Sequence, residues 1–264
     1  MKPKLLLSII GYGTVIATLF SSCYPGSQIA DPYIVDQSRQ KENQYYVKTS
    51  PSVPLLKEKN DISIAGGVSS GSQFTAGEFH AAYMPGKHVG ITGSYARGDN
   101  KEYVKLNRFE IGSGYVKKLS PNWHFETYAG FGHSKIENRH YTGYSTIKST
   151  HYFIQPAIAV SNLANTVQFA FVSRFEGTNF NVTDAVFNTE REPFSDGKIR
   201  DLNAKPFHML WQPGAVFRFG WQKFLFQGAY SYAADLSDAG IYGSKGSFLA
   251  GIVLRFNTGK KEKM

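Results

Sequence analysis

Apolar and polar positions alternate most regularly near the C-terminal end of the chain, over residues 246–257 (GSFLAGIVLRFN). Every second residue is apolar and falls on one face of an extended chain: Phe248, Ala250, Ile252, Leu254 and Phe256. The opposite face mixes small residues with Arg255. This period of two predicts a β-strand with one continuous apolar face.

The same period recurs from Asp61 onward and predicts ten strands, at residues 61–70, 75–84, 88–97, 106–117, 123–134, 150–161, 166–176, 207–219, 223–233 and 246–257. Tight turns alternate along the chain with long loops at 98–105, 135–149, 177–206 and 234–245. Short turns alternating with long loops are typical of membrane barrels. We predict an all-β fold: an antiparallel up-and-down transmembrane β-barrel of about ten strands, with eight as the alternative count.

The apolar phase of the strands carries many aromatic rings, among them Phe169 and Trp211. A barrel of this strand number has room inside only for ordinary side chains, so these rings would overfill it. The opposite phase carries small, polar and charged residues. We therefore predict that the rings face lipid and that the small and charged side chains face a narrow lumen.

Charged residues of both signs occupy the inward phase: Glu78, Arg108, Glu110, Glu126, Arg174, Glu176, Arg218 and Arg255. An isolated charge in a dry lumen is costly, whereas carboxylates and guanidinium groups can pair. We predict that these residues form a network across the lumen, which plugs the barrel and leaves no wide pore.

The N-terminal residues are typical of a processing segment. Lys2 and Lys4 precede an apolar run at residues 5–20, and small residues precede Cys23. The stretch LFSSC resembles the lipobox of bacterial lipoproteins, which implies that Cys23 becomes the acylated N-terminus of the mature chain. The alternative is an ordinary signal peptide with an incidental cysteine. Cys23 is the single cysteine of the sequence and forms no internal disulfide.

These patterns divide the chain into a signal peptide at 1–22, a lipid-anchored irregular tether at 23–60, the barrel at 61–257 and a charged tail at 258–264. The tether is rich in proline and polar residues and has no sustained period. It is long enough to connect a lipid anchor to the barrel's rim. An even strand count returns the chain to the side where it entered, which suits an anchor in the inner leaflet of the outer membrane.

Composition narrows the function classes. The mean hydropathy of −0.29 excludes a helical membrane bundle but is compatible with strands that are only half apolar. The net charge of +9 could indicate nucleic-acid binding, but the Lys and Arg residues are scattered, with no basic helix or zinc-ligand set. We expect no nucleic-acid partner, no cofactor and no metal site.

The strongest catalytic candidate is Gly132-His133-Ser134, which loosely resembles the His/Ser pairs of outer-membrane lipid A deacylases and phospholipases. A nucleophilic serine needs a base within hydrogen-bond reach. Neighbouring residues of a strand point to opposite faces, so His133 can activate Ser134 only if both lie in a loop. We expect a protein that is not an enzyme, with an outer-membrane hydrolase acting on lipid as an alternative.

Residues 75–257, with their terminal aromatic residue and turn-and-loop alternation, resemble the small outer-membrane β-barrels of Gram-negative bacteria. This resemblance implies the outer membrane as location, and the separate lipobox resemblance implies Cys23 as the lipid anchor. We predict an accessory or scaffold subunit that contacts outer-membrane lipid and other outer-membrane proteins through its wall or loop 177–206. The alternatives are a narrow channel for small solutes or ions and a soluble periplasmic β-lipoprotein.

Overall fold

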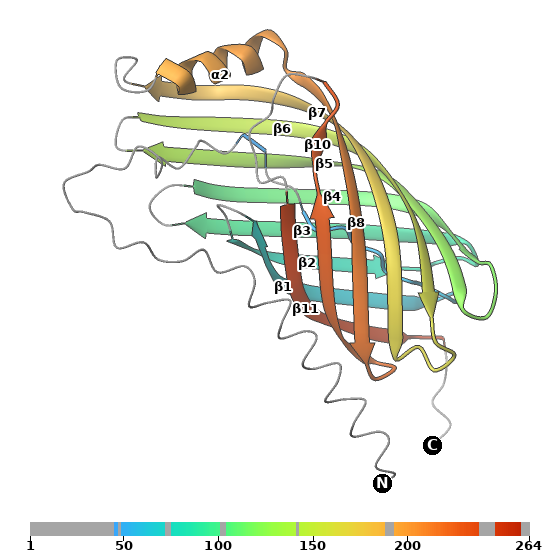
Figure 1. Ribbon diagram of the computed structural model, residues 1–264. Helices are drawn as coiled ribbons and strands as arrows, with labels where there is room; N and C mark the ends of the chain where they lie inside the picture. The colour runs from blue at the N-terminus through green and yellow to red at the C-terminus, as the bar shows by residue number, and fades with distance from the viewer. Residues whose placement is uncertain are drawn as a thin grey trace, which may run out of the picture. The chain divides into compact units, whose positions relative to one another are not determined.

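The structure, a computed structural model, describes residues 45–46, 49–71, 75–100, 104–140, 143–187, 193–237 and 246–259, all within one compact unit, Lys41–Met264. Its elements are β1 (Asp61–Gly71), β2 (Thr75–Tyr83), β3 (Val89–Asn100), β4 (Val104–Lys118), β5 (Trp123–His140), β6 (Gly143–Ser161), β7 (Val167–Phe187), α2 (Pro193–Ala204), β8 (Phe207–Gly220), β9 (Phe224–Tyr232), β10 (Ala234–Asp235) and β11 (Gly246–Asn257). Figure 1 shows the strands curving around a common interior.

The strands form one closed antiparallel barrel. From β1 to β9 each long strand pairs with the next along the chain, and the ring closes because β11 pairs with both β9 and β1. The two-residue β10 continues β9 along β8 in an unchanged register. Pro213 of β8 lies beside the break between them, and it has no N–H to donate to a ladder. The predicted ten-stranded up-and-down barrel is confirmed.

Three strands, β5, β6 and β7, run at least six residues beyond the predicted ranges 123–134, 150–161 and 166–176. β5 and β6 pair from Trp123 and Val160 up to His140 and Gly143, so most of the predicted loop 135–149 is hairpin. The predicted loop 177–206 contains the end of β7 and helix α2, which packs against β7. Both predictions of long irregular loops are therefore wrong. No helix in the described ranges is long and apolar enough to span a membrane.

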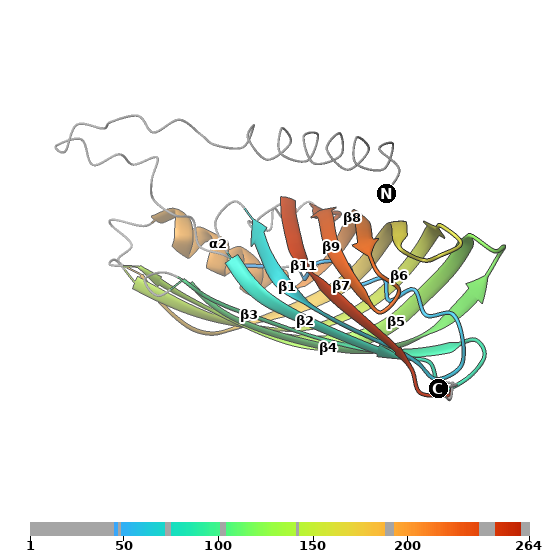
Figure 2. The same cartoon turned by 90° about the horizontal axis from the view of Figure 1, so that it is seen from below.

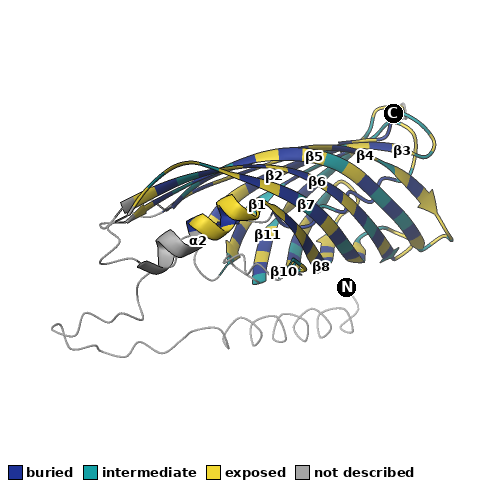
Figure 3. Ribbon diagram, turned by 90° about the horizontal axis from the view of Figure 1, so that it is seen from above, coloured by how far each residue is buried: buried dark blue, intermediate teal, exposed yellow. Residues whose placement is uncertain are grey.

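The outer face of the wall is covered with exposed apolar side chains, and buried and exposed residues alternate along each strand (Figure 3). We call this surface the apolar belt; its members include Phe79, Ile91, Phe109, Phe131, Tyr152, Phe171, Phe217, Phe226, Tyr230 and Ile252. Tyr152 and Phe171 are 64% and 60% exposed. Trp211 is also exposed, and Phe169 is half-buried on the same face. The rings point outward, as volume required.

The interior contains part of the N-terminal segment as well as wall side chains. Val53, Leu55 and Leu56 are 1–3% exposed and pack against inward side chains of the strands. A tether that ends at the barrel's rim was expected here. Residues 49–56 instead lie inside the barrel, because their apolar side chains and polar backbone both find partners there.

Candidate functional site: the filled lumen

The segment that occupies the barrel is residues 45–60, of which 45–46 and 49–60 are described; we call it the lumen segment. Its contacts follow the barrel axis from the long-loop ends of the strands to the short-turn ends. In chain order, Tyr46 Oη donates to Glu176 Oε1 (3.1 Å), Ser50 contacts Glu78, Ser52 O accepts from Gln155 (2.7 Å), Pro54 O accepts from Arg255 (3.1 Å), and Asn60 N donates to Met84 O (2.7 Å). The segment therefore crosses the barrel lengthwise (Figure 2).

Apolar contacts hold the segment at three levels. At the long-loop end, Tyr45 and Tyr46 pack in one cluster with Ile199 and Leu202 of α2. Val53 and Leu55 pack with alanine and valine side chains of β6 to β8, and Leu56 packs with Met84, Val116 and Tyr128. Burying one such aliphatic side chain contributes about 1.5–3 kcal/mol. The segment is thus part of the hydrophobic core.

A glycine makes room for the segment where it passes β8. A Cβ atom added to Gly214 would meet Pro51 Cγ at 3.0 Å and the backbone oxygen of Tyr230 at 2.8 Å. Any larger residue would therefore push against both the segment and the neighbouring strand.

Four charged side chains form a central ion-pair cluster: Arg108 and Glu110 of β4, and Arg174 and Glu176 of β7. Arg108 Nη2 lies 2.6 Å from Glu110 Oε1 and 2.7 Å from Glu176 Oε2. Arg174 Nη2 lies 2.6 Å from Glu110 Oε1 and 2.8 Å from Glu176 Oε2. Each cation thus bridges both anions, and the cluster joins two strands that are not neighbours in the sheet.

Neutral donors satisfy the remaining oxygens of this cluster. Thr178 Oγ1 donates to Glu176 Oε1 (2.9 Å), and Ser94 Oγ donates to Glu110 Oε2 (3.1 Å). His151 Nε2 lies 3.1 Å from Glu110 Oε1. All four charged side chains are at most 5% exposed. A buried cluster with two charges of each sign and full hydrogen bonding avoids the large cost of an unpaired buried charge.

Glu78 of β2 binds the lumen segment directly. Its carboxylate accepts the backbone N–H of Ser50 (2.9 Å) and the Ser50 hydroxyl (3.1 Å). His80 Nε2 lies 3.1 Å from the same carboxylate. One inward side chain therefore satisfies a backbone donor that the segment could not satisfy by itself.

Glu126 of β5 faces the segment at Leu55, which has a left-handed backbone (φ 55°). Glu126 is 1% exposed, and neither of its carboxylate oxygens has a hydrogen-bond partner among the described residues. A bulky residue such as Leu55 is rarely left-handed, so this conformation is held by the packing around it.

The two remaining predicted cations bind amides rather than carboxylates. Arg218 Nε donates to Gln227 Oε1 (2.7 Å). Arg255 Nη2 donates to Gln168 Oε1 (3.0 Å) and to the carbonyl oxygen of Pro54.

Lys57 lies at the short-turn rim, outside the strands. Its ammonium group contacts Asn165 Oδ1 and lies 3.5 Å from Ser161 Oγ. Burial lowers the pKa of Lys57 to about 8, and the positive charges of Arg255 and Lys118 act in the same direction. Asp61 and Glu126 act in the opposite direction but do not cancel the effect of burial.

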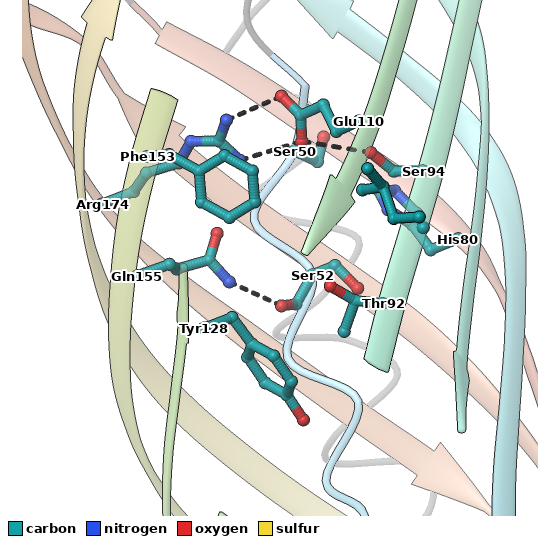
Figure 4. A pocket seen from close by; sticks show the side chains of 12 residues that line it. Ser50, Ser52, His80, Thr92, Ser94, Glu110, Tyr128, Phe153, Gln155 and Arg174 are labelled. Atoms are coloured by element: carbon teal, nitrogen blue, oxygen red, sulfur yellow. Dashed lines mark hydrogen bonds and ion pairs between the residues drawn. The ribbon is translucent and has the colours of Figure 1, made fainter. Parts of the chain in front are cut away.

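The segment leaves a small cavity in the middle of the barrel. A cavity of about 20 Å³ lies between Ser50, Ser52, Glu110, Gln155 and Arg174 (Figure 4). A space of this size holds about one water molecule. Figure 4 shows the segment passing beside the Arg174–Glu110 pair, so peptide and ion pairs together occupy the middle of the barrel.

Comparisons with known proteins support no closer assignment. No known protein family and no curated protein matches the chain. Similar solved structures include the N-terminal β-barrel domain of OprF from Pseudomonas aeruginosa (11% identity, 76% of this chain and 100% of that chain, TM-score 0.35). A second is OprG from Pseudomonas aeruginosa (13% identity, 76% of this chain and 98% of that chain, TM-score 0.36). A third is the KdgM porin (8% identity, 74% of this chain and 99% of that chain, TM-score 0.36). Identities and TM-scores this low add nothing to the topology described above.

All eight side chains assigned to the lumen by sequence lie on the inner face of the wall, seven buried and Arg255 half-buried. Only Arg108, Glu110, Arg174 and Glu176 form one cluster. Glu78, Glu126, Arg218 and Arg255 lie outside this cluster. Of these, Glu78 and Arg255 form hydrogen bonds with the lumen segment. Sequence carries a signal for the central cluster, since the tripeptide Arg-Phe-Glu occurs at both 108–110 and 174–176. Cys23 lies outside the described residues.

The catalytic candidate does not assemble. His133 and Ser134 are both in β5, with His133 exposed on the outer face and Ser134 buried on the inner face. Ser134 Oγ lies 2.6 Å from Ser149 Oγ of the neighbouring strand. His133 therefore cannot serve as the base for Ser134. In the described part of the chain, no group of three or more His, Cys, Asp or Glu residues could hold a metal ion.

Proposed function

We propose that this chain is an outer-membrane β-barrel anchored by an acylated Cys23, that it does not conduct, and that it is an accessory or scaffold subunit of an outer-membrane assembly. The apolar belt supports the membrane location. Soluble monomers rarely expose large contiguous apolar surfaces, whereas a barrel in lipid needs one around its whole circumference.

The observation that carries the non-conducting role is the lumen segment. It crosses the barrel lengthwise, its described apolar residues are buried, and the cavity beside Ser50 and Ser52 holds about one water molecule. If the lumen is filled, partners can bind only to the outer surface of the protein. That surface includes the apolar belt, the extended hairpin of β5 and β6, and the solvent-exposed side of α2, where Arg200 and Asp201 are exposed.

A planar lipid bilayer tests the absence of conduction. The full-length chain should insert without current steps, while a porin added under the same conditions gives them. Regular single-channel steps from the purified chain would favour the channel alternative and overturn the proposal.

A narrow channel is the second candidate because the central ion-pair cluster belongs to the wall. If the lumen segment withdrew, Arg108, Glu110, Arg174 and Glu176 would line a charged pore. This candidate requires conductance that rises when contacts of the segment are weakened. The double variant Tyr46→Ala/Leu56→Ala should then conduct in the same bilayer assay, whereas the wall-only variant Ile252→Val should not.

Co-purification tests the scaffold role. A tagged full-length chain, extracted from outer membranes in mild detergent, should return with at least one other outer-membrane protein in constant ratio. Recovery of the chain alone would contradict the role. Incorporation of labelled fatty acid into the wild-type chain, but not into Cys23→Ser, tests the anchor separately.

A further inference from the structure

The direction in which the lumen segment crosses the barrel determines on which side of the membrane the residues before it begin. β1 begins at Asp61 and β11 ends at Asn257, and these two residues pair at the short-turn end of the barrel. The chain just before β1 is at this end too, since Asn60 N donates to Met84 O in the turn between β2 and β3. In an ordinary tether the preceding residues would continue away from this rim.

The segment instead runs back through the lumen to the opposite rim. Tyr46 Oη reaches Glu176, and Tyr45 and Tyr46 share a cluster with Ile199 and Leu202 of α2. Helix α2 follows the long-loop end of β7. Tyr45 therefore lies at the long-loop end, where the described part of the segment begins.

A return to the short-turn side is blocked by both available routes. At the level of Ser50 and Ser52 the cavity beside the segment measures about 20 Å³, which is enough for one water molecule but not for a second strand of peptide. The lipid route would expose irregular backbone to hydrocarbon, where each unpaired polar group costs several kcal/mol. Length alone would not prevent it, because the 45 − 23 = 22 residue steps from Cys23 to Tyr45 span up to about 75 Å. The barrier is the bilayer itself.

We propose that the lumen segment carries the N-terminal part of the chain through the barrel, so that the lipid on Cys23 inserts into the leaflet at the long-loop rim. This inference rests on the proposed membrane location and anchor. In outer-membrane barrels the short turns face the periplasm and the long loops face the exterior. The anchor then lies in the outer leaflet, at the cell surface, and not in the inner leaflet expected from the even strand count.

Labelling with a membrane-impermeant maleimide on intact Gram-negative cells tests this topology, using the full-length chain with one added cysteine. Lys41→Cys and Ser38→Cys report on the residues before Tyr45. Leu163→Cys reports on the short turn between β6 and β7, where Leu163 is 78% exposed. The two N-terminal reporters should react in intact cells, and Leu163→Cys only after the outer membrane is permeabilised.

Each other result overturns the proposal. N-terminal reporters that react only after permeabilisation would place the anchor at the periplasmic side. All reporters reacting under the same condition would show that the segment does not cross the barrel. The fatty-acid labelling of Cys23 is an independent measurement, so loss of the anchor and failure of the topology are told apart.

Discussion

Ser50 and Glu78 are joined by two hydrogen bonds, one from the backbone N–H and one from the hydroxyl of Ser50, over 2.9 and 3.1 Å. The residues lie far apart in sequence, and neither is exposed by more than 5%. The contact fixes the middle of the lumen segment to β2. The contact also makes the segment sensitive to mutation, because removing the carboxylate takes away the hydrogen-bond acceptor of the buried Ser50 N–H.

Glu78→Ala should therefore destabilise the barrel by about 1–3 kcal/mol, the cost of leaving a buried donor unsatisfied. Glu78→Gln keeps an acceptor for the Ser50 N–H and should lose less. Urea unfolding of both variants in detergent micelles measures the difference. Equal losses would mean that the charge of Glu78, and not its role as acceptor, matters for the contact.

The central ion-pair cluster predicts strong non-additivity. Arg174→Met leaves two carboxylates with one guanidinium group and should cost about 3–5 kcal/mol. The double variant Arg174→Met/Glu110→Gln keeps the charges balanced through Arg108 and Glu176. Its loss should be smaller than the sum of the two single losses by about 0.5–3 kcal/mol. Additive unfolding free energies would show that the four groups are not coupled.

Lys57 predicts a pH dependence at the alkaline side. Its pKa is about 8 in the folded chain and 10.5 as the ordinary value, so the unfolded chain binds more protons between these pH values. The contribution of Lys57 to the free energy of unfolding therefore increases as the pH rises from 8 to 10.5, which stabilises the folded chain.

The measurement is the difference in unfolding free energy between wild type and Lys57→Met, in which other titrating groups cancel. This difference should move in favour of wild type over that range and stay flat below pH 7. Lys57→Arg, charged throughout, should behave like Lys57→Met. A flat difference for wild type would mean that the ammonium group is well hydrated.

The apolar belt predicts a penalty for charge on the outer wall. Ile252 is in the middle of β11 and is 41% exposed on the outer face. Ile252→Arg should reduce stability in lipid vesicles by about 2–4 kcal/mol if it lies near the bilayer midplane. Ile252→Val is the matched control and should be nearly neutral. A soluble, well-behaved Ile252→Arg variant would argue against hydrocarbon at this face.

The strands themselves could be predicted from sequence because a barrel wall separates two environments. Neighbouring residues of a strand, such as the exposed Phe171 and the buried Val172, lie in different environments. The period of two is therefore visible in the sequence without coordinates. The number of rings then decides which phase is outside, since volume excludes them from a narrow interior. The same reasoning separated His133 from Ser134.

Beyond the apolar belt that rule stops working. At Lys135, Glu137 and Arg139 the outer face of β5 carries charges, and Lys135 and Glu137 pair at 2.6 Å. Both faces of the strand can then be polar, and hydrogen-bonded hairpin resembles a loop in sequence. Helix α2 gives a weak sequence signal for a related reason: of residues 199–204, the part of the helix whose side chains the structure describes, only Ile199 and Leu202 are buried.

The sequence by itself determined the closed wall, its outward rings and the inward charges, because those follow from local alternation and from volume. The tertiary structure alone decided what fills the lumen and which charges meet. Arg255 donates a hydrogen bond to the carbonyl oxygen of Pro54, although most of the chain separates them in sequence. No periodic pattern in residues 45–60 predicts this contact. Such contacts form only when the strands have closed around the segment. The apolar side chains of the segment are then buried, and its backbone polar groups must pair with whichever inward side chains lie beside them.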